Sequence, residues 1–173
     1  MIREIRPEDV PAAVALVHDL AEYERAAPDC ALTVEQLHAA LFTPAPALFG
    51  HVAEDTGEVV GCALWFRNFS TWRGVHGIYI EDLYVAPERR GRGHGRALLA
   101  ALAAVCVDLG YARLEWSVLD WNTPSIAFYR ELGAVPMEEW TTYRLDGPAL
   151  VALGTTGDRP GPSAPSTIAG TAR

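Results

Sequence analysis

The chain has 173 residues, of which 50% are hydrophobic and 21% charged, which fits one globular domain and excludes a disordered or fibrous chain. Its net charge of −8, from 14 basic against 22 acidic residues, argues against general nucleic-acid binding and favours cationic small partners. We expect no membrane association and a cytoplasmic protein with free thiols, because the sequence has no membrane-length apolar run, no secretory signal and no CxxC pair among its three cysteines.

The first half of the chain predicts a strand, two helices and a β-hairpin. Apolar residues recur at helical spacing in the first helix, and Thr33 with Gln36 gives a capping-box signal for the second. The turn residues of the hairpin are Asp55, Thr56 and Gly57. These elements are expected at residues 3–6 (strand), 8–25 and 33–42 (helices), and 48–54 and 59–67 (strands).

The second half predicts a strand, a turn rich in Arg and Gly, and then two helices separated by a strand. Gly110 is expected to end the first of these helices, and Asn122 is expected to cap the second, which Gly133 ends. The expected elements are residues 77–85 (strand), 94–109 (helix), 113–119 (strand), 122–132 (helix) and 134–145 (one or two strands). The predicted fold class is therefore α/β (α+β), with a mixed sheet and helices.

The strongest local signal is the segment Arg90-Gly91-Arg92-Gly93-His94-Gly95-Arg96. Glycines allow backbone N–H groups to converge on an anion, and the first N–H groups of the following helix have no partner inside it. A solvated Gly-rich turn is the alternative that this pattern alone leaves open. The segment lacks the Gly-Lys-Ser/Thr of a Walker loop and does not follow a first βαβ unit, so a pyrophosphate cradle of another kind is favoured.

Four segments together resemble the GNAT N-acetyltransferase superfamily, and in particular its diamine (spermidine/spermine) acetyltransferase branch. The glycine-rich segment resembles that superfamily's acetyl-CoA pyrophosphate loop, Q/R-x-x-G-x-G/A. Residues 80–85 (IEDLYV) resemble the strand that carries the thioester, and residues 121–129 (WNTPSIAFY) with Leu132-Gly133-Ala134 resemble the closing segment. Residues 20–24 (LAEYE) resemble the first helix of the branch. The resemblance runs from about Ile2 to Leu153 and implies a GNAT acyl-CoA acyltransferase fold.

The resemblance implies acetyl-CoA as cosubstrate and assigns its contacts to three segments. The loop residues would hold the pyrophosphate through backbone N–H groups, the strand would pair with the pantetheine arm, and the start of the later helix would contact the same arm. The Val85 N–H would face the thioester carbonyl as the oxyanion donor. The implied cofactor-binding residues are Leu83, Tyr84, Val85, Arg90, Gly91, Arg92, Gly93, His94, Gly95, Arg96, Asn122, Thr123, Pro124 and Ser125.

Two side chains are implied to move protons. Tyr129 is the candidate general acid for the leaving thiolate, since a tyrosine is protonated near neutral pH. Glu81 is the candidate acceptor of the amine proton through water. From spacing alone, Tyr129 also fits plain packing on an amphipathic helix, and Glu81 and Asp82 fit polar strand-end residues. Because adjacent strand residues face opposite ways, only one of the two acids is expected to face the cleft.

The resemblance places the amine substrate beside a further set of residues, although core packing for Trp116 and a solvated helix end for Glu24 are the alternatives. The polyamine branch typically has an acid just before the Trp matched by Trp72, and here residues 68–71 (NFST) hold none. The branch also has an acid near the final strands; Glu138 and Glu139 are nearby, but Trp140 and Thr141 are candidates for the matching place. The implied substrate-binding residues are Tyr23, Glu24, Glu81, Asp82, Glu115, Trp116 and Ser117.

These observations predict an acetyl-CoA-dependent N-acetyltransferase that acts on a primary amine of a small cationic substrate, by direct attack in a ternary complex. Because the sequence has fewer acids at these places than the polyamine branch, a smaller amine such as a diamine, thialysine or an amino acid would also fit. Another acceptor, such as a protein N-terminus or an antibiotic, and a CoA-binding sensor without turnover remain the alternatives. No metal is expected, because the five histidines show no ligand spacing. A homodimer is implied by resemblance only, with residues 1–154 as the acetyltransferase domain and 155–173 as a flexible tail.

Overall fold

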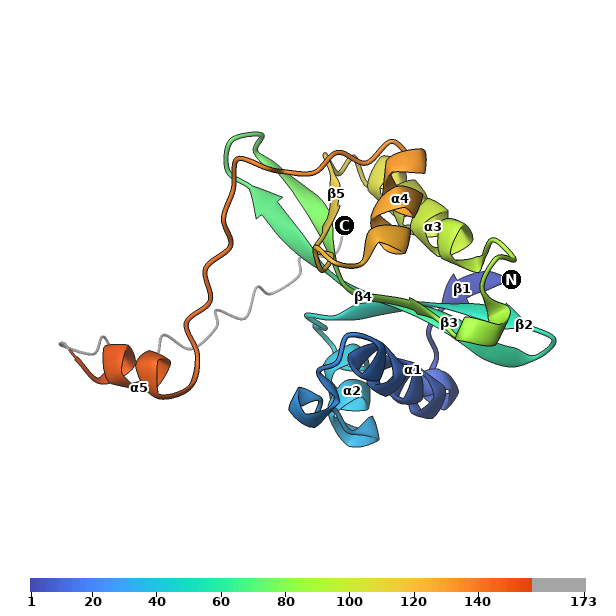
Figure 1. Cartoon of the computed structure of the whole chain (residues 1–173), viewed down its shortest axis with the longest axis horizontal. Helices are drawn as coiled ribbons and strands as arrows, with labels where there is room; N and C mark the ends of the chain where they lie inside the picture. The colour runs from blue at the N-terminus through green and yellow to red at the C-terminus, as the bar shows by residue number, and fades with distance from the viewer. Residues whose placement is uncertain (157–173) are drawn as a thin grey trace, which may run out of the picture. The chain divides into compact units, whose positions relative to one another are not determined.

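The computed structural model describes residues 1–156, and its centre is one mixed β-sheet (Figure 1). The strand order is β1-β2-β3-β4-β5. The first four strands pair antiparallel, and β5 pairs parallel with β4. The strands are β1 (Ile2–Glu4), β2 (Phe49–Asp55), β3 (Glu58–Ser70), β4 (Val75–Val85) and β5 (Leu114–Trp116). The predicted mixed sheet is confirmed.

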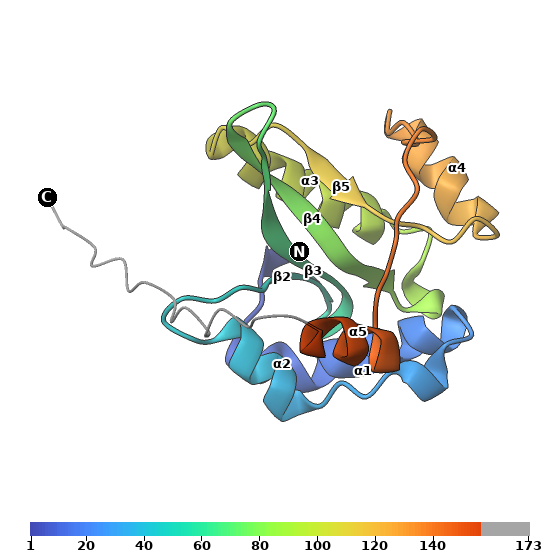
Figure 2. The same cartoon turned by 90° about the vertical axis from the view of Figure 1, so that its left-hand side faces the viewer.

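Helices cover both faces of this sheet. The helices α1 (Val10–Tyr23) and α2 (Val34–Leu41) lie on one face, and α3 (His94–Asp108) lies on the other, as Figures 1 and 2 show. Short 3₁₀ turns at 7–9, 27–29 and 87–89 connect these elements. The buried cluster on the α1 side joins both helices to β2, β3 and β4, with members that include Val10, Val14, Val17, Leu37, Val52, Cys62, Leu64 and Tyr84. Burial of these side chains fixes the sheet against α1.

Local signals set the helix ends where the sequence predicts them. Thr33 and Gln36 form both hydrogen bonds of a capping box at the start of α2. Gly110 follows α3 with a φ of +67° and Gly133 follows α4 (Thr123–Glu131) with a φ of +87°, a backbone region that favours glycine. The side-chain oxygen of Asn122 accepts a hydrogen bond from the Ser125 N–H at 3.4 Å, which is the expected N-cap contact.

Four expected elements differ from the structure. β3 and β4 extend past their predicted ends, because ring contacts between Phe66 and Tyr79 and between Phe69 and His76 hold the longer hairpin together. β5 is shorter than its predicted range. The strands expected at 134–145 are wrong: that segment forms no strand in the structure, and Pro136 lacks the N–H that a ladder needs. Helix α5 (Gly147–Thr155), which was not predicted, follows Asp146 at its N-cap position.

The described chain divides into two compact units, residues 1–127 and residues 128 onward, with the boundary inside α4. The first unit holds the sheet with α1, α2 and α3. The second holds the end of α4, a connecting segment and α5. The domain boundary expected at residue 154 stays a prediction, and residues 157–173 of the expected tail lie outside the described residues. Among residues 1–156, no helix is long and apolar enough to cross a membrane.

The hairpin between β2 and β3 has a strained residue at its tip. Asp55 pairs with Glu58 across a two-residue turn in which Thr56 has a φ of +52° and Gly57 a φ of +83°. Such turns favour Asn-Gly, and a β-branched residue is an outlier at positive φ. We therefore expect Thr56→Asn to raise the free energy of unfolding by about 1 kcal/mol, measured by thermal denaturation. Gly57→Ala should lower it, and a fall in stability for Thr56→Asn would contradict this reading of the turn.

Candidate active site

A β-bulge at Glu81 divides β4 into two parts with different partners. Leu64 pairs with Asp82 while the next residue of β3, Trp65, pairs with Ile80, so Glu81 is the extra residue. The bulge resets the alternation of side chains along β4. Tyr84 accordingly belongs to the buried cluster on the α1 side, whereas Ile80, an even number of residues away, is buried outside that cluster. The two neighbouring acids thus lie at the point where the strand changes register.

The part of β4 after the bulge presents backbone groups at its edge. In the described residues, β5 pairs with β4 only at residues 78–80. The Ala86 N–H donates to the Val60 carbonyl at 2.9 Å, so the neighbouring pair, Gly61 and Val85, is a pair without mutual hydrogen bonds. Val85 and, by the same alternation, Leu83 therefore turn their amides away from β3. Tyr84 instead turns its amide groups toward β3.

The glycine-rich loop lies directly after this edge and leads into α3. Gly91 and Gly93 have φ values of +74° and +84°, and a Cβ built on either meets nothing within 4 Å. Gly93 is the N-cap of α3, so the N–H groups of His94, Gly95 and Arg96 have no partner inside the helix. Positive φ, open space and unpaired N–H groups together fit the demands of a phosphate.

The arginines of the loop differ in what they contact. Arg90 lies between two aromatic rings, with its guanidinium carbon 5.1 Å from the Tyr23 centroid and 5.0 Å from that of Tyr84. Its Nε also donates to the Val85 carbonyl at 2.9 Å. Arg92 and Arg96 are exposed. Arg90 therefore ties the loop to β4 and α1, while Arg92 and Arg96 are positioned to meet an anion from solvent.

A second contact joins the end of α1 to the start of α4. The Tyr23 hydroxyl donates to the buried Asn122 Oδ1 at 3.0 Å, and the Trp121 ring lies 5.8 Å from the Tyr23 ring. The neighbouring Thr123 and Pro124 are exposed in the first turn of α4. Residues expected for the amine and residues expected for acetyl-CoA thus meet through Tyr23.

The acids near the bulge differ in environment. Glu81 is exposed, whereas Asp82 is largely buried. Burial, with the negative charges of Glu81 and Glu24, raises the pKa of Asp82 to about 6. Burial also raises the pKa of Glu24 above its usual range. Because Asp82 lies two residues from Tyr84 with no bulge between them, it faces α1, where Glu24 follows the helix. These acids form a negative region beside the backbone edge of β4.

The expected substrate residues of β5 already have partners in the fold. Glu115 accepts hydrogen bonds or ion-pair contacts from Asn68 Nδ2 at 2.6 Å and from Arg113 Nε at 2.7 Å. The Ser117 hydroxyl bonds the Tyr79 hydroxyl at 2.8 Å. Trp116 is half-buried. Sequence reasoning missed Asn68 and Tyr79, which share this face of the sheet, because nothing local in the sequence marks partners that are 47 and 38 residues away.

Tyr129 belongs to the second unit, unlike the other candidate residues. Its ring lies 5.4 Å from that of Phe128, and its carbonyl accepts from the N–H groups of Leu132 and Ala134 at the end of α4. Its expected role as a proton donor therefore stays a prediction. Among residues 1–156, no group of three or more His, Cys, Asp or Glu side chains could hold a metal ion.

Comparison with known proteins agrees with this geometry. Residues 13–134 match the model of the Acetyltransferase (GNAT) family. Thialysine N-epsilon-acetyltransferase of Bos taurus is 36% identical over 164 residues, which cover 88% of this chain and 96% of the relative. Spermidine/spermine N(1)-acetyltransferase-like protein 1 of Homo sapiens is 26% identical over 88% of this chain but 23% of its own length. An integron cassette protein of V.cholerae shares the fold with a TM-score of 0.76 at 24% identity, over 90% of this chain and 98% of that one.

Proposed function

The chain belongs to the GNAT acetyltransferase family, in its diamine acetyltransferase branch, and from that premise we propose that it moves the acetyl group of acetyl-CoA to the side-chain amine of a small cationic acceptor of the thialysine type. That it is an N-acetyltransferase follows from the family and from named N-acetyltransferase relatives. The observation that carries the finer proposal is the exposed backbone edge of β4, which leads into the glycine-rich start of α3 and has acids beside it.

The donor site combines two kinds of contact. The edge amides of Leu83 and Val85 suit an extended pantetheine arm, which can pair with them as a strand would. The N–H groups at the start of α3, with Arg92 and Arg96 nearby, suit the pyrophosphate. Both features lie in the first unit and follow each other along the chain. They therefore support acetyl-CoA as the donor.

The acceptor is proposed from charge and from what the sequence lacks. Glu24, Glu81 and Asp82 supply negative charge for one ammonium group, while the segment before Trp72 has no acid for a second one. A long polyamine needs several such acids, whereas thialysine carries a single side-chain amine. The relative that acts on thialysine is also more similar, over nearly its whole length, than the spermidine/spermine acetyltransferase-like one. These points favour a thialysine-type acceptor.

The proposed mechanism is direct transfer. Glu81 accepts a proton of the ammonium group through water, and the neutral amine nitrogen attacks the thioester carbon to form a tetrahedral intermediate, from which the carbon–sulfur bond then breaks. The Val85 N–H stabilises the oxyanion of this intermediate, and Tyr129 gives its proton to the thiolate that leaves. The nitrogen loses its second proton to water, and water returns a proton to Tyr129, so that the products are the amide and the free thiol. We further propose a homodimer in the cytoplasm. Size-exclusion chromatography with light scattering measures the molar mass of the protein in solution. A mass of two chains is expected, and a mass of one chain would contradict the dimer.

Thiol release with acetyl-CoA over a panel of amines tests the proposal. The panel holds thialysine, lysine, putrescine, spermidine, spermine and one aminoglycoside. The account expects the highest kcat/KM for thialysine. Preference for spermidine or spermine would show that acids elsewhere replace the missing ones, and preference for the aminoglycoside would reject the acceptor class. Acetyl-CoA binding without turnover on any amine would favour a CoA-binding sensor.

The raised pKa of Asp82 gives an expected pH dependence. A cationic amine is held by the ionised carboxylate, so its KM should rise as the pH falls through about 6. Asp82→Asn should raise KM at pH 8 and remove this dependence, while acetyl-CoA affinity stays unchanged. Initial rates at varied amine concentration from pH 5 to pH 8 measure both effects. A wild-type KM that is flat across this range would contradict the role of Asp82.

The same shift predicts the effect of Asp82 on stability. A carboxyl whose folded pKa is raised from 3.8 to about 6 stabilises the fold only while protonated, so this contribution is lost as the pH rises through that window. At pH 7, Asp82→Asn should therefore raise the free energy of unfolding by on the order of 2 kcal/mol. The variant should accordingly unfold at a higher temperature than wild type. The difference should vanish near pH 3. Glu81→Gln is the comparison variant: Glu81 is exposed and its charge supplies only a part of the Asp82 shift, which burial dominates, so its replacement should raise the unfolding temperature less than Asp82→Asn does.

A further inference from the structure

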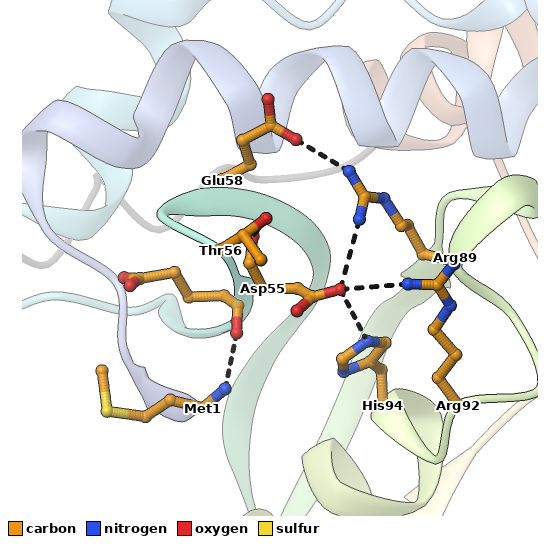
Figure 3. Close-up of polar contacts among 8 residues, drawn as sticks. Met1, Asp55, Thr56, Glu58, Arg89, Arg92 and His94 are labelled. Carbon is orange, nitrogen blue, oxygen red and sulfur yellow. Dashed lines mark hydrogen bonds and ion pairs between the residues drawn. The ribbon is translucent and has the colours of Figure 1, made fainter.

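One carboxylate at the tip of the β2–β3 hairpin faces three basic groups that surround the glycine-rich loop. The Asp55 Oδ2 atom lies 3.2 Å from Arg89 Nη1, 3.4 Å from Arg92 Nη1 and 3.9 Å from His94 Nε2. Figure 3 shows all three side chains pointing at this one oxygen. Arg89 also contacts Glu58, at 2.9 Å. Arg89 precedes the glycine-rich loop, Arg92 lies in it and His94 is the first residue of α3, so the contacts of Asp55 reach both ends of the exposed residues 91–93.

The loop has few other contacts that could hold its shape. Residues 91–93 are exposed, and the positions where Gly91 and Gly93 would carry side chains face open space. Glycines also have more backbone freedom to lose on ordering than other residues. Whereas Arg90 contacts β4 and α1, the hydrogen bonds of the Arg89 and Arg92 side chains go to Asp55 and Glu58. The free loop therefore depends on ion pairs more than on packing.

Asp55 is itself held firmly. It is the last residue of β2 and pairs with Glu58 across the two-residue turn, so its backbone position is fixed by the sheet. Its side chain is about three-quarters buried, at 26% exposure, whereas that of Arg92 is 55% exposed. Arg89, at 24% exposure, is paired with both acids. The sheet thus holds the carboxylate in place, and the most exposed of its three partners is Arg92, inside the loop.

We propose that Asp55 is a positioning residue for the cosubstrate: it holds Arg89, Arg92 and His94 so that the loop keeps, before binding, the shape that receives the pyrophosphate. The proposal rests on the function proposed above and extends it to a residue outside the loop motif. A loop that is already ordered loses less conformational entropy when the ligand binds, which raises affinity.

Asp55 could instead act as a competitor that occupies the cations that the pyrophosphate needs. The structure favours the positioning role, because Arg89 pairs with Asp55 and offsets its charge. The longest arginine contact is that of exposed Arg92, which can turn to a phosphate while Arg89 stays paired. The backbone N–H groups at the start of α3 are not occupied by Asp55 and remain available to the ligand.

The test compares Asp55→Asn with the matched control Glu58→Gln, using two acetyl donors. Glu58 contacts Arg89 but neither Arg92 nor His94. For Asp55→Asn we expect KM for acetyl-CoA to rise about ten-fold or more with kcat nearly unchanged, since charge-assisted contacts are the strong ones. With S-acetylpantetheine, which has no pyrophosphate, the variant should match wild type. Glu58→Gln should resemble wild type with both donors, and Asp55→Glu should recover part of the lost affinity.

Calorimetry with CoA covers variants that turn over poorly, and thermal unfolding confirms that each variant folds. Tighter CoA binding by Asp55→Asn would overturn the proposal in favour of competition. Equal losses with acetyl-CoA and S-acetylpantetheine would overturn it in favour of a general structural defect, and unchanged KM would overturn it outright. Failure of wild type to bind acetyl-CoA would instead reject the proposed function, so the two failures are distinguishable.

Discussion

Replacing Tyr129 with Phe is expected to lower kcat by about ten-fold or more, because a positioned general acid typically contributes about 10²–10⁴-fold. The substitution removes only the hydroxyl, so affinity for CoA should change little. Steady-state rates with saturating acetyl-CoA measure the first quantity and calorimetry the second. The expected pattern is a loss of turnover with intact binding, which loss of packing alone would not give.

A matched control and a second donor sharpen this experiment. Tyr143 lies in the same unit and is 92% exposed, so Tyr143→Phe should leave kcat unchanged. When the donor is an acetyl thioester of an acidic aryl thiol, the leaving group is a stable thiolate that departs without needing a proton. The loss caused by Tyr129→Phe should therefore shrink with that donor. Turnover like that of wild type with acetyl-CoA would contradict the assignment of Tyr129 as the acid.

Replacing Gly93 with Val is expected to abolish CoA binding. Gly93 has a φ of +84°, which a β-branched residue rarely adopts, and open space lies where its side chain would project. The new side chain would fill the space that we assign to the pyrophosphate and would displace the N–H groups at the start of α3. Calorimetry with CoA should detect no binding at concentrations that saturate wild type.

Gly110→Val controls for the backbone cost of this change. Gly110 follows the opposite end of α3, has a φ of +67°, and also has nothing within 4 Å of a built Cβ. In both variants the free energy of unfolding should fall by the amount typical of a strained residue, about 1–3 kcal/mol, and the unfolding temperature should fall with it. Only Gly93→Val should lose CoA binding. Equal loss of binding in both variants, or unchanged affinity in Gly93→Val, would contradict a pyrophosphate site at the loop.

Local signals predicted α1 to α4 and their capped ends, although not α5, because capping is decided by a few neighbouring residues. Thr33 with Gln36, Asn122, and the glycines at 110 and 133 all act within one helical turn of the ends that they mark. The prediction of strands at 134–145 was wrong because strand formation, unlike capping, is not decided by neighbouring residues alone. Apolar residues there suggest a strand, but a strand exists only where another strand pairs with it, and local composition does not supply the partner.

The site could be predicted only in part. The loop, the β4 strand and the acids were identified in advance, but the rule of alternation could not locate the bulge at Glu81, which sets Glu81 exposed and Asp82 largely buried. The contacts of Asp55 with Arg89 and of Tyr23 with Asn122 join residues 34 and 99 positions apart. Such pairs depend on tertiary packing, which the local pattern of a single sequence does not reveal.

The most direct test of the central claim is identification of the product formed from acetyl-CoA and thialysine by the purified protein. Mass spectrometry counts the acetyl groups added, and NMR assigns the acetylated nitrogen. The amount of CoA thiol released is measured in the same sample and compared with the amount of product. The account predicts one acetyl group on the side-chain nitrogen for each CoA released. Thialysine recovered unmodified, or acetylated on its α-amino group, while acetyl-CoA is bound by the protein, would contradict it.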